Sequence, residues 1–301
     1  MKPKRIWPAI AVAVTFVLLA GCGSPTHSAA PSAASPLPSQ SSSSPPPDLS
    51  PSPSGGSGVR CTTSAAKGTC GPYNYQGITG SNGSTTFVLN NMWGANSGTT
   101  QTLSADSPGS WSVVANAQPA GNTAVQTYPD TQQMYTRSDN TPDPLSRFGS
   151  IISSFTENLN AASGTSAEAA YDIWIGQNAS TNYADEVMIW NDQVNRGTCG
   201  GATVKANADF GGSNGIPRQN WTLCDYRGSE LIWYLTGSNE QSGAVDVLSM
   251  LTWLEGHGYL PAGSGLNQID YGFEICSTTG AKTFTVSRYA IKSACNSGAS
   301  C

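Results

Sequence analysis

Charge is scarce in this 301-residue chain, because charged residues make up 11% of it against about 25% in typical soluble proteins. The formal net charge is −5, and no run of basic residues occurs after the first few positions. Because nucleic-acid binding depends on clustered Lys and Arg, we expect no nucleic-acid partner. Against so little charge, a carboxylate inside an apolar segment stands out.

Histidine is nearly absent, which bears on catalysis. His27 lies in a low-complexity stretch, and His257 follows a predicted helix, where we expect it to cap the helix or face solvent. Residues 211–215 (Gly-Gly-Ser-Asn-Gly) match the elbow of serine hydrolases, but the sequence predicts neither a strand before them nor a helix after them, and Pro217 follows at once. A Ser-His-Asp site is therefore disfavoured. No motif for a metal or a cofactor is present, and we expect neither.

Apolar runs long enough to span a bilayer are also missing. Residues 6–20 form an apolar run after Lys2, Lys4 and Arg5, and its length and flanks predict a secretory signal over residues 1–21. The signal ends in Leu-Ala-Gly-Cys, which resembles a bacterial lipobox. Cys22 would then be lipidated and hold an exported protein on the extracellular face of the cell membrane. The alternative is a plain signal peptide and release into the medium.

Residues 22–58 are almost entirely Ser, Pro, Ala and Gly. This composition offers too little apolar surface to offset chain entropy, so we predict a disordered tether that Pro stiffens. Residues 59–301 then form one domain, which is long but ordinary for a β-sandwich.

The sequence of the domain has the pattern of an all-β protein, with short runs of Thr, Val, Tyr, Trp and Phe between clusters of Gly, Asn, Ser and Pro. The predicted strands are residues 85–89, 111–115, 169–175, 186–190, 231–236, 271–277 and 283–291. Residues 245–254 differ, because their apolar side chains recur at helical spacing up to Gly256. We predict a single helix there, packed on the outside of the sandwich.

Two of the predicted strands carry a carboxylate on one face. In residues 185–190 (Asp-Glu-Val-Met-Ile-Trp), strand alternation places Glu186, Met188 and Trp190 together, opposite two aliphatic residues. In residues 270–276 (Asp-Tyr-Gly-Phe-Glu-Ile-Cys), the same alternation places Glu274 on one face of the strand and Phe273 and Ile275 on the other. Glycoside hydrolysis needs two carboxylates that flank one bond, and two such strands in a concave sheet would present them.

Four motifs, in this order and spacing, resemble glycoside hydrolase family 12: residues 90–94 (Asn-Asn-Met-Trp-Gly), 170–174 (Ala-Tyr-Asp-Ile-Trp), 186–190 (Glu-Val-Met-Ile-Trp) and 272–274 (Gly-Phe-Glu). The similarity covers roughly residues 71–292. It implies a jelly-roll sandwich of two antiparallel sheets with a concave substrate cleft and one packed helix. It also implies an endo-acting enzyme that cleaves β-1,4-glucans, either as an endoglucanase or as a xyloglucanase.

The resemblance further implies residue roles in a retaining mechanism, whose two carboxyls lie about 5–5.5 Å apart. Glu186 would be the nucleophile and Glu274 the acid/base, while Asp172 would hydrogen-bond Glu186 and tune its pKa. Trp93 would stack on a sugar and Asn91 would bond the same unit. Met188 and Trp190 would line the groove next to the nucleophile.

One region departs from the family. Many members continue past the tryptophan of the nucleophile strand into a Pro-Ile-Gly loop across the cleft, whereas residues 191–208 contain Cys-Gly-Gly and no such motif. The preference among cellulose, mixed-linkage β-glucan and xyloglucan therefore cannot be transferred. We expect a monomer that binds β-glucan, and the rival hypothesis is a non-catalytic, surface-tethered β-glucan-binding protein.

Eight cysteines in an exported chain predict disulfides. Our first pair is Cys199–Cys224, and Cys61–Cys70 and Cys295–Cys301 would each clip a terminus. With Cys22 lipidated, Cys276 would be left as a free thiol. The alternative is that Cys301 is the unpaired one and Cys276 bonds elsewhere.

Overall fold

The computed structural model describes residues 61–74, 85–135, 141–176, 183–226 and 230–296. The predicted signal segment, the tether and the lipidated Cys22 lie outside these ranges, so they stay predictions. Within the described ranges, no helix has the length and apolar character needed to cross a membrane.

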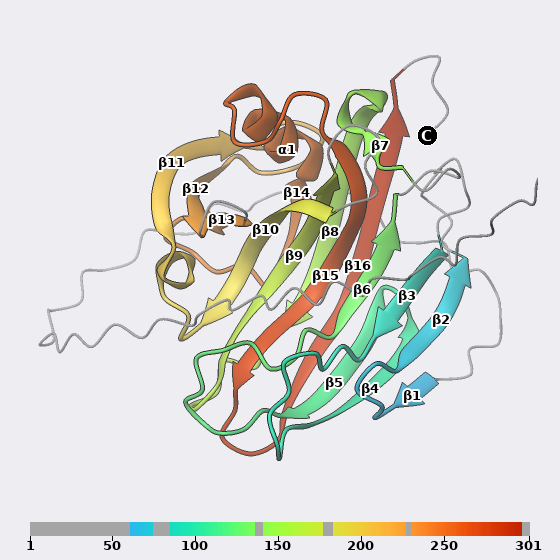
Figure 1. The fold of residues 1–301 in the computed structure, drawn as a ribbon, viewed down its shortest axis with the longest axis vertical. Coiled ribbons are helices and arrows are strands. Elements are labelled where there is room, and N and C mark those ends of the chain that lie inside the picture. Colours follow the sequence, from blue (N-terminus) through green and yellow to red (C-terminus); the bar gives the residue numbers. More distant parts are fainter. Residues whose placement is uncertain (1–60, 75–84, 136–140, 177–182, 227–229, 297–301) are drawn as a thin grey trace, which may run out of the picture.

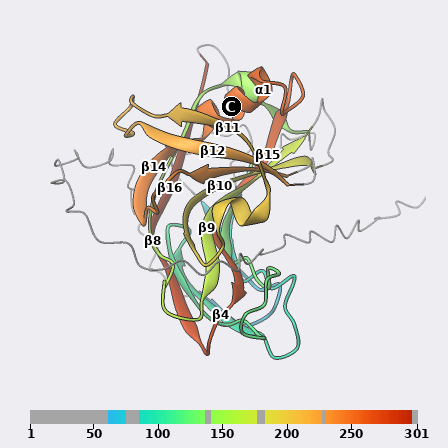
Figure 2. The same ribbon diagram turned by 90° about the vertical axis from the view of Figure 1, so that its left-hand side faces the viewer.

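Two sheets packed face to face make up the domain, as Figures 1 and 2 show. The smaller sheet has the spatial order β1 (Cys61–Thr63), β4 (Thr100–Ser107), β5 (Ser110–Asn116), β16 (Lys282–Cys295), β8 (Phe148–Asn158) and β14 (Ser242–Asp246). The larger sheet has the order β11 (Thr203–Phe210), β12 (Gln219–Tyr226), β13 (Glu230–Leu235), β10 (Tyr183–Val194), β9 (Ser166–Gly176), β15 (Gly265–Ser277), β6 (Asp130–Met134), β3 (Thr85–Leu89) and β2 (Thr69–Asn74). The short β7 (Asp143–Pro144) pairs with β15, and two 3-10 turns are η1 (Leu145–Arg147) and η2 (Thr198–Gly201).

This jelly-roll sandwich confirms the predicted fold class, and each strand predicted from the sequence overlaps an observed one. Strands such as β4 and β8 were missed because Ser, Thr, Asn and Asp weaken their apolar alternation. Neighbouring strands run antiparallel, with the exception of β10 and β13, which are parallel. After β10 the chain crosses to the edge of the sheet and forms β11 and then β12. It next forms β13 between β12 and β10, and β13 therefore runs parallel to β10.

The core lies between the sheets and fixes the outward face of the larger one. Tyr171 from β9, Tyr271 from β15 and Tyr289 from β16 pack together in its centre. The rings of Tyr271 and Tyr289 stack with centroids 4.9 Å apart, and the ring of Tyr171 is tilted against that of Tyr271 at 4.7 Å. Val187 and Ile189 of β10 are fully buried in the same core. Because strand side chains alternate, the residues between these core positions face away from the smaller sheet.

The predicted helix is α1 (Val247–Gly256), which lies at one end of the sandwich near β8 (Figure 1). It begins two residues later than predicted because Val245 and Asp246 complete β14, and the Asp246 side chain accepts a hydrogen bond from the Ser249 backbone N–H at 3.1 Å. His257 is exposed and caps the helix, with its Nδ1 2.8 Å from the Trp253 carbonyl oxygen. The prediction of a capping histidine is confirmed.

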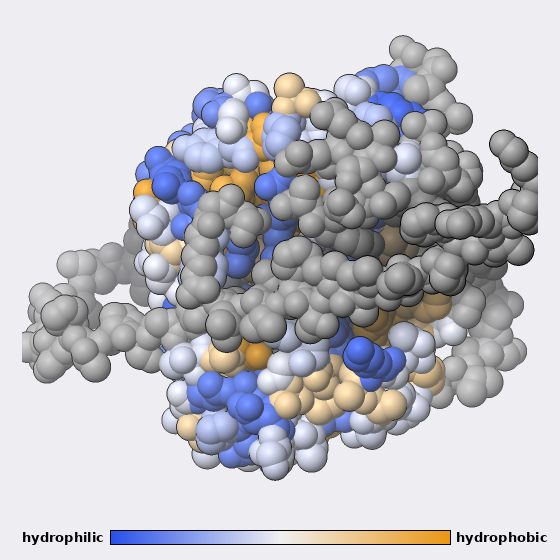
Figure 3. All heavy atoms as spheres, viewed as in Figure 1, coloured by the Kyte–Doolittle hydropathy of each residue, from blue (hydrophilic) through white to orange (hydrophobic). Residues whose placement is uncertain are grey.

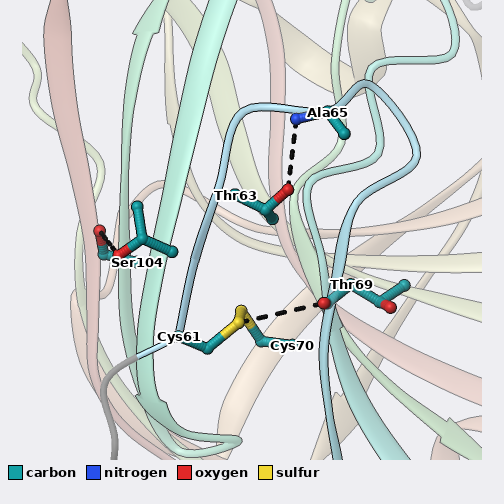
Figure 4. Close-up of a disulfide and its surroundings, with 7 residues drawn as sticks. Cys61, Thr63, Ala65, Thr69, Cys70 and Ser104 are labelled. Atoms are coloured by element: carbon teal, nitrogen blue, oxygen red, sulfur yellow. Dashed lines mark hydrogen bonds between the residues drawn. A yellow bond between two sulfur atoms is a disulfide. The ribbon is translucent and has the colours of Figure 1, made fainter.

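Two of the predicted disulfides are present. Cys61–Cys70 joins β1 of the smaller sheet to β2 of the larger one and so clips the sandwich at its edge (Figure 4). Cys199–Cys224 joins η2 to β12.

The predicted free thiol at Cys276 is wrong, since Cys276 is disulfide-bonded and no described cysteine is free. Cys295 is bonded too, but its predicted partner Cys301 lies outside the described residues. Sequence spacing favoured partners that are close along the chain, whereas bonding depends on which Cβ atoms the fold brings together.

Candidate active site

Three adjacent strands in the middle of the larger sheet carry the predicted acids. Glu186 lies on β10, Asp172 on the central β9, and Glu274 on β15. Each faces away from the core and is less than a tenth exposed, at 6%, 8% and 7%. The fold therefore brings the three carboxyls predicted from the sequence onto one face, with β9 between the two glutamates.

Asp172 and Glu186 form one unit. The register sets Asp172 opposite Met188, so Glu186 is its diagonal neighbour, and a hydrogen bond joins the two carboxyls. Burial raises the pKa of Glu186 well above its usual value, and the charges of Asp172 and Glu274 raise it further. Glu274 pairs with Glu168 of β9 and not with Asp172, but its charge still acts on Glu186 across the sheet.

Glu274 is surrounded by residues that the sequence alone did not single out. Glu168 lies opposite it on β9 and shares a side-chain hydrogen bond with it. Arg196, just after β10, places Nε 2.7 Å from Glu168 Oε2 and Nη2 3.7 Å from Glu274 Oε2. Glu168 could have been identified, because it shares the strand face of Asp172, but no sequence signal places Arg196 here.

Two more buried aspartates extend the acidic row. Asp270 lies opposite Asp172 on β15, and Asp130 begins β6, the next strand. Burial raises the pKa of Asp130 to about 8, although the hydrogen bond from Asn91 Nδ2, at 3.1 Å, opposes that rise. Burial also raises the pKa of Asp270, with the charge of Asp130 as the next cause. Strand alternation could have indicated Asp270, which shares the face of Glu274, but Asp130 is brought here only by strand pairing.

Tyr128 covers this row from the segment before β6. Its hydroxyl donates a hydrogen bond to the Ala170 carbonyl oxygen at 3.2 Å, and the side chain is 3% exposed. Burial and the neighbouring acids raise the pKa of Tyr128, so it stays a neutral hydrogen-bond donor. Within the described ranges, no group of three or more His, Cys, Asp or Glu residues is arranged to hold a metal ion.

The predicted sugar-binding residues separate into two sets. Asn91 and Trp93 follow β3, and Trp93 is 45% exposed, so its ring is open to a ligand. Met188 and Trp190 are 1% and 2% exposed and pack with the Cys199–Cys224 disulfide in a second apolar cluster. The geometry therefore favours Trp93 over Trp190 as a stacking platform.

Figure 3 shows the face that is seen in Figure 1, where hydrophilic residues form several separate groups with apolar residues between them. The row from Trp93 to Glu186 runs across the strands, from the end of β3 through β6, β15 and β9 to β10.

The buried acids predict that the domain is more stable at pH 5 than at pH 9. Burial raises the pKa of Glu157, on β8, to about 9, and that of Asp130 to about 8, whereas both titrate near pH 4 in an unfolded chain. Their contribution to stability is fully present below about pH 4, is lost progressively as pH rises at about 1.4 kcal/mol per proton and pH unit, and is gone once pH has passed the folded pKa values of about 8 and 9. Thermal melts at pH 5, 7 and 9 measure this.

Asp130→Asn is the matched variant for that experiment. The substitution removes one titrating group and keeps its shape, so the melting temperature should depend less steeply on pH than in the wild type. A wild-type melting temperature that rises steadily from pH 5 to pH 9 would contradict the prediction.

The model of Glycosyl hydrolase family 12 matches residues 85–293, which is most of the chain. Similar solved structures include the xyloglucanase domain of NopAA, a type three effector from Sinorhizobium fredii, in complex with cellobiose (23% identity, 78% of this chain and 99% of that one, TM-score 0.59). A family 12 xyloglucanase from Bacillus licheniformis in complex with ligand has 21% identity over 78% of this chain and 100% of its own, with TM-score 0.61. The catalytic domain of Humicola grisea Cel12A with a soaked thio cellotetraose has 19% identity, covers 78% and 99%, and gives TM-score 0.62. At these identities the solved structures establish the shared fold, and no curated protein matches the chain significantly.

Proposed function

This chain belongs to glycosyl hydrolase family 12, and we propose that it hydrolyses internal β-1,4 bonds of glucan chains with retention of configuration. One observation carries the proposal: Glu186 and Glu274 lie on one face of the sheet, on the strands that flank β9, with Asp172 bonded to Glu186. Two carboxyls on one strand face suit a double displacement at a glycosidic carbon.

In the first step the Glu186 carboxylate attacks the anomeric carbon, and Glu274 gives its proton to the departing glycosidic oxygen. A covalent glycosyl-enzyme and a free reducing-end fragment result. In the second step the ionised Glu274 takes a proton from water, and the resulting hydroxide displaces Glu186. The product leaves with its original β configuration, and each glutamate regains its starting protonation state.

Asp172 acts on Glu186 through their hydrogen bond. Burial raises the pKa of both groups well above their usual values, and the hydrogen bond between the two carboxyls requires that one of them carry a proton. When the proton is on Asp172, Glu186 is ionised, is held in place by the Asp172 hydroxyl, and is ready to attack. Asp172 therefore orients the nucleophile and limits the cost of burying its charge.

A β-glucan is the substrate class that these features support. Trp93 offers an exposed ring, and Asn91, two residues before it, offers an amide; the two suit the apolar face and the hydroxyls of a glucose unit. The solved relatives named above include two xyloglucanases, and two of the three structures contain cello-oligosaccharides. Cellulose, mixed-linkage β-glucan and xyloglucan are the candidates among which an assay must choose.

The test is hydrolysis of neutral soluble glucans, namely hydroxyethyl cellulose, mixed-linkage β-glucan and xyloglucan, with Glu274→Gln purified in parallel as the control. We expect viscosity to fall well before reducing ends accumulate, because internal cleavage shortens chains quickly. Proton NMR of the first products should show the β-anomer.

The outcomes separate the competing hypotheses. Binding to these polymers without release of reducing ends would favour the non-catalytic glycan-binding protein. First appearance of the α-anomer would mean inversion, with Glu186 acting as a base for water and the two carboxyls farther apart than about 5.5 Å.

A further inference from the structure

Arg196 is a buried cation beside the proposed acid/base. Its side chain is 1% exposed, and its guanidinium reaches Glu168 through Nε and Glu274 through Nη2, at the distances given above. The same group lies over the Trp190 ring, 5.1 Å from the centroid, and Nη1 contacts Cys276 Sγ. These contacts engage the planar guanidinium both at its edge and on its face.

The backbone around Arg196 is fixed as well. Its N–H donates to Gln193 Oε1 at 3.0 Å, and the Cys199–Cys224 disulfide ties the following turn to β12. Gly200 has a left-handed φ of +57°, and a Cβ there would meet the Trp190 ring at 3.0 Å, so the turn sits directly on that ring. This is the region in which the chain departs from the family pattern, and here it supplies a cation.

The charged and titratable groups around Glu274 come from several elements of the larger sheet. The groups are Arg196 after β10, Glu168 and Asp172 on β9, Glu186 on β10, and Tyr128 before β6. Arg196 is the cation of this set and favours an ionised Glu274, whereas the neighbouring carboxylates favour a protonated one. Burial raises the pKa of Glu168 and the charge of Arg196 lowers it, and when Glu168 is ionised it offsets the guanidinium at close range.

We propose that Arg196 and Glu168 are positioning residues that hold Glu274 in place. Their opposite charges keep both the protonated and the ionised form of Glu274 accessible. The proposal deepens the proposed function, on which it rests. Glu274 must be protonated when the glycosidic oxygen leaves and ionised when water attacks. Arg196 alone would favour the ionised state and Glu168 alone the protonated state, whereas the two together leave both states accessible.

The experiment compares pH profiles of kcat/KM for single and double variants on a soluble β-glucan. The basic limb reports loss of the acid proton from the free enzyme. Arg196→Gln should move this limb to higher pH and Glu168→Gln to lower pH, each by roughly one unit or more. Arg196→Lys keeps the charge and should move it less than Arg196→Gln.

The double variant Arg196→Gln with Glu168→Gln removes both charges and leaves no unpaired one behind. Its basic limb should return toward that of the wild type. Arg218→Gln, which removes an exposed ion pair with Asp209 on β11, is the matched control and should leave the profile unchanged. Two single variants that lose activity without moving the limb, or that move it in the same direction, would overturn the proposal.

A second measurement does not need turnover. In protein with ¹³C-labelled glutamate side chains, the Glu274 carboxyl resonance is assigned by its loss in Glu274→Gln and then titrated in each variant. Opposite shifts of its midpoint in the two single variants support the proposal, and equal or absent shifts overturn it. If the wild type released no reducing ends, the proposed function would fail while this titration still decided the roles of Arg196 and Glu168.

Discussion

Replacing either glutamate by glutamine should reduce hydrolysis of an unactivated β-glucan by roughly a thousandfold or more. Glu186→Gln removes the attacking oxygen anion, and Glu274→Gln removes the proton that the leaving oxygen needs. Both groups act in the same transition state, so the double variant should be little worse than either single one. Initial rates of reducing-end release measure the effect, and melting temperatures check that each variant is folded.

The two variants should differ on an aryl glycoside with an acidic phenol as leaving group. Such a phenol leaves with little protonation, so Glu274→Gln should still form the glycosyl-enzyme, and added azide should replace the water that Glu274 would have activated. Glu186→Gln should form no such intermediate. Azide that occupies the space of the lost carboxylate would give an α-glycosyl azide from this variant, whereas Glu274→Gln should give the β product.

The reverse pattern would exchange the two roles. The electrostatics of the free protein make that outcome a meaningful one, because Arg196 lies beside Glu274 while the pKa of Glu186 is raised. The anomer of the azide product therefore decides between the assignment that the family motif implies and the assignment that charge alone would favour.

Gly272→Ala should destabilise the domain strongly and lower activity at the same time. Gly272 lies opposite Asp130, and an ideal Cβ on it would come within 2.0 Å of the Pro129 carbonyl oxygen and 2.8 Å of Asp130 Cα. Both contacts are with backbone, so β6 must move away from β15. Such overpacking typically costs about 1–3 kcal/mol, and the melting temperature of a domain this size falls by roughly 2–4 °C per kcal/mol.

Activity should fall as well, because the displaced segment carries Tyr128 and Asp130 over the acidic row, and Glu274 follows Gly272 on the same strand face. Gly256→Ala is the control, since nothing lies within 4 Å of a Cβ at that helix position. It should leave the melting temperature unchanged or raise it slightly. Equal melting temperatures and equal rates for Gly272→Ala and the wild type would show that β6 does not press on β15 as described.

Much of the site could be predicted from residues within one strand. Two-residue alternation separates Glu186 from Val187 and Glu274 from Phe273, because a buried face tolerates the apolar set and excludes the carboxylates. The four ordered motifs indicated the fold and the acids. Cys61–Cys70 was predicted from its short separation, and Cys199–Cys224 from the Gly- and Asn-rich segment that the two cysteines flank. These are local properties, set by backbone geometry and short chain separations.

Which strands are neighbours, and at what register, was decided by the tertiary structure. Asp130 joins the acidic row because β6 pairs with β15, and Arg196 meets Glu168 and Glu274 because the turn after β10 folds back over the sheet. The same turn buries Trp190, which was predicted to line the groove beside the nucleophile because it shares the strand face of Glu186. Periodicity states which way a side chain points within its own element, but burial, charge neighbours and pKa depend on what other elements place above it, and those contacts are long-range.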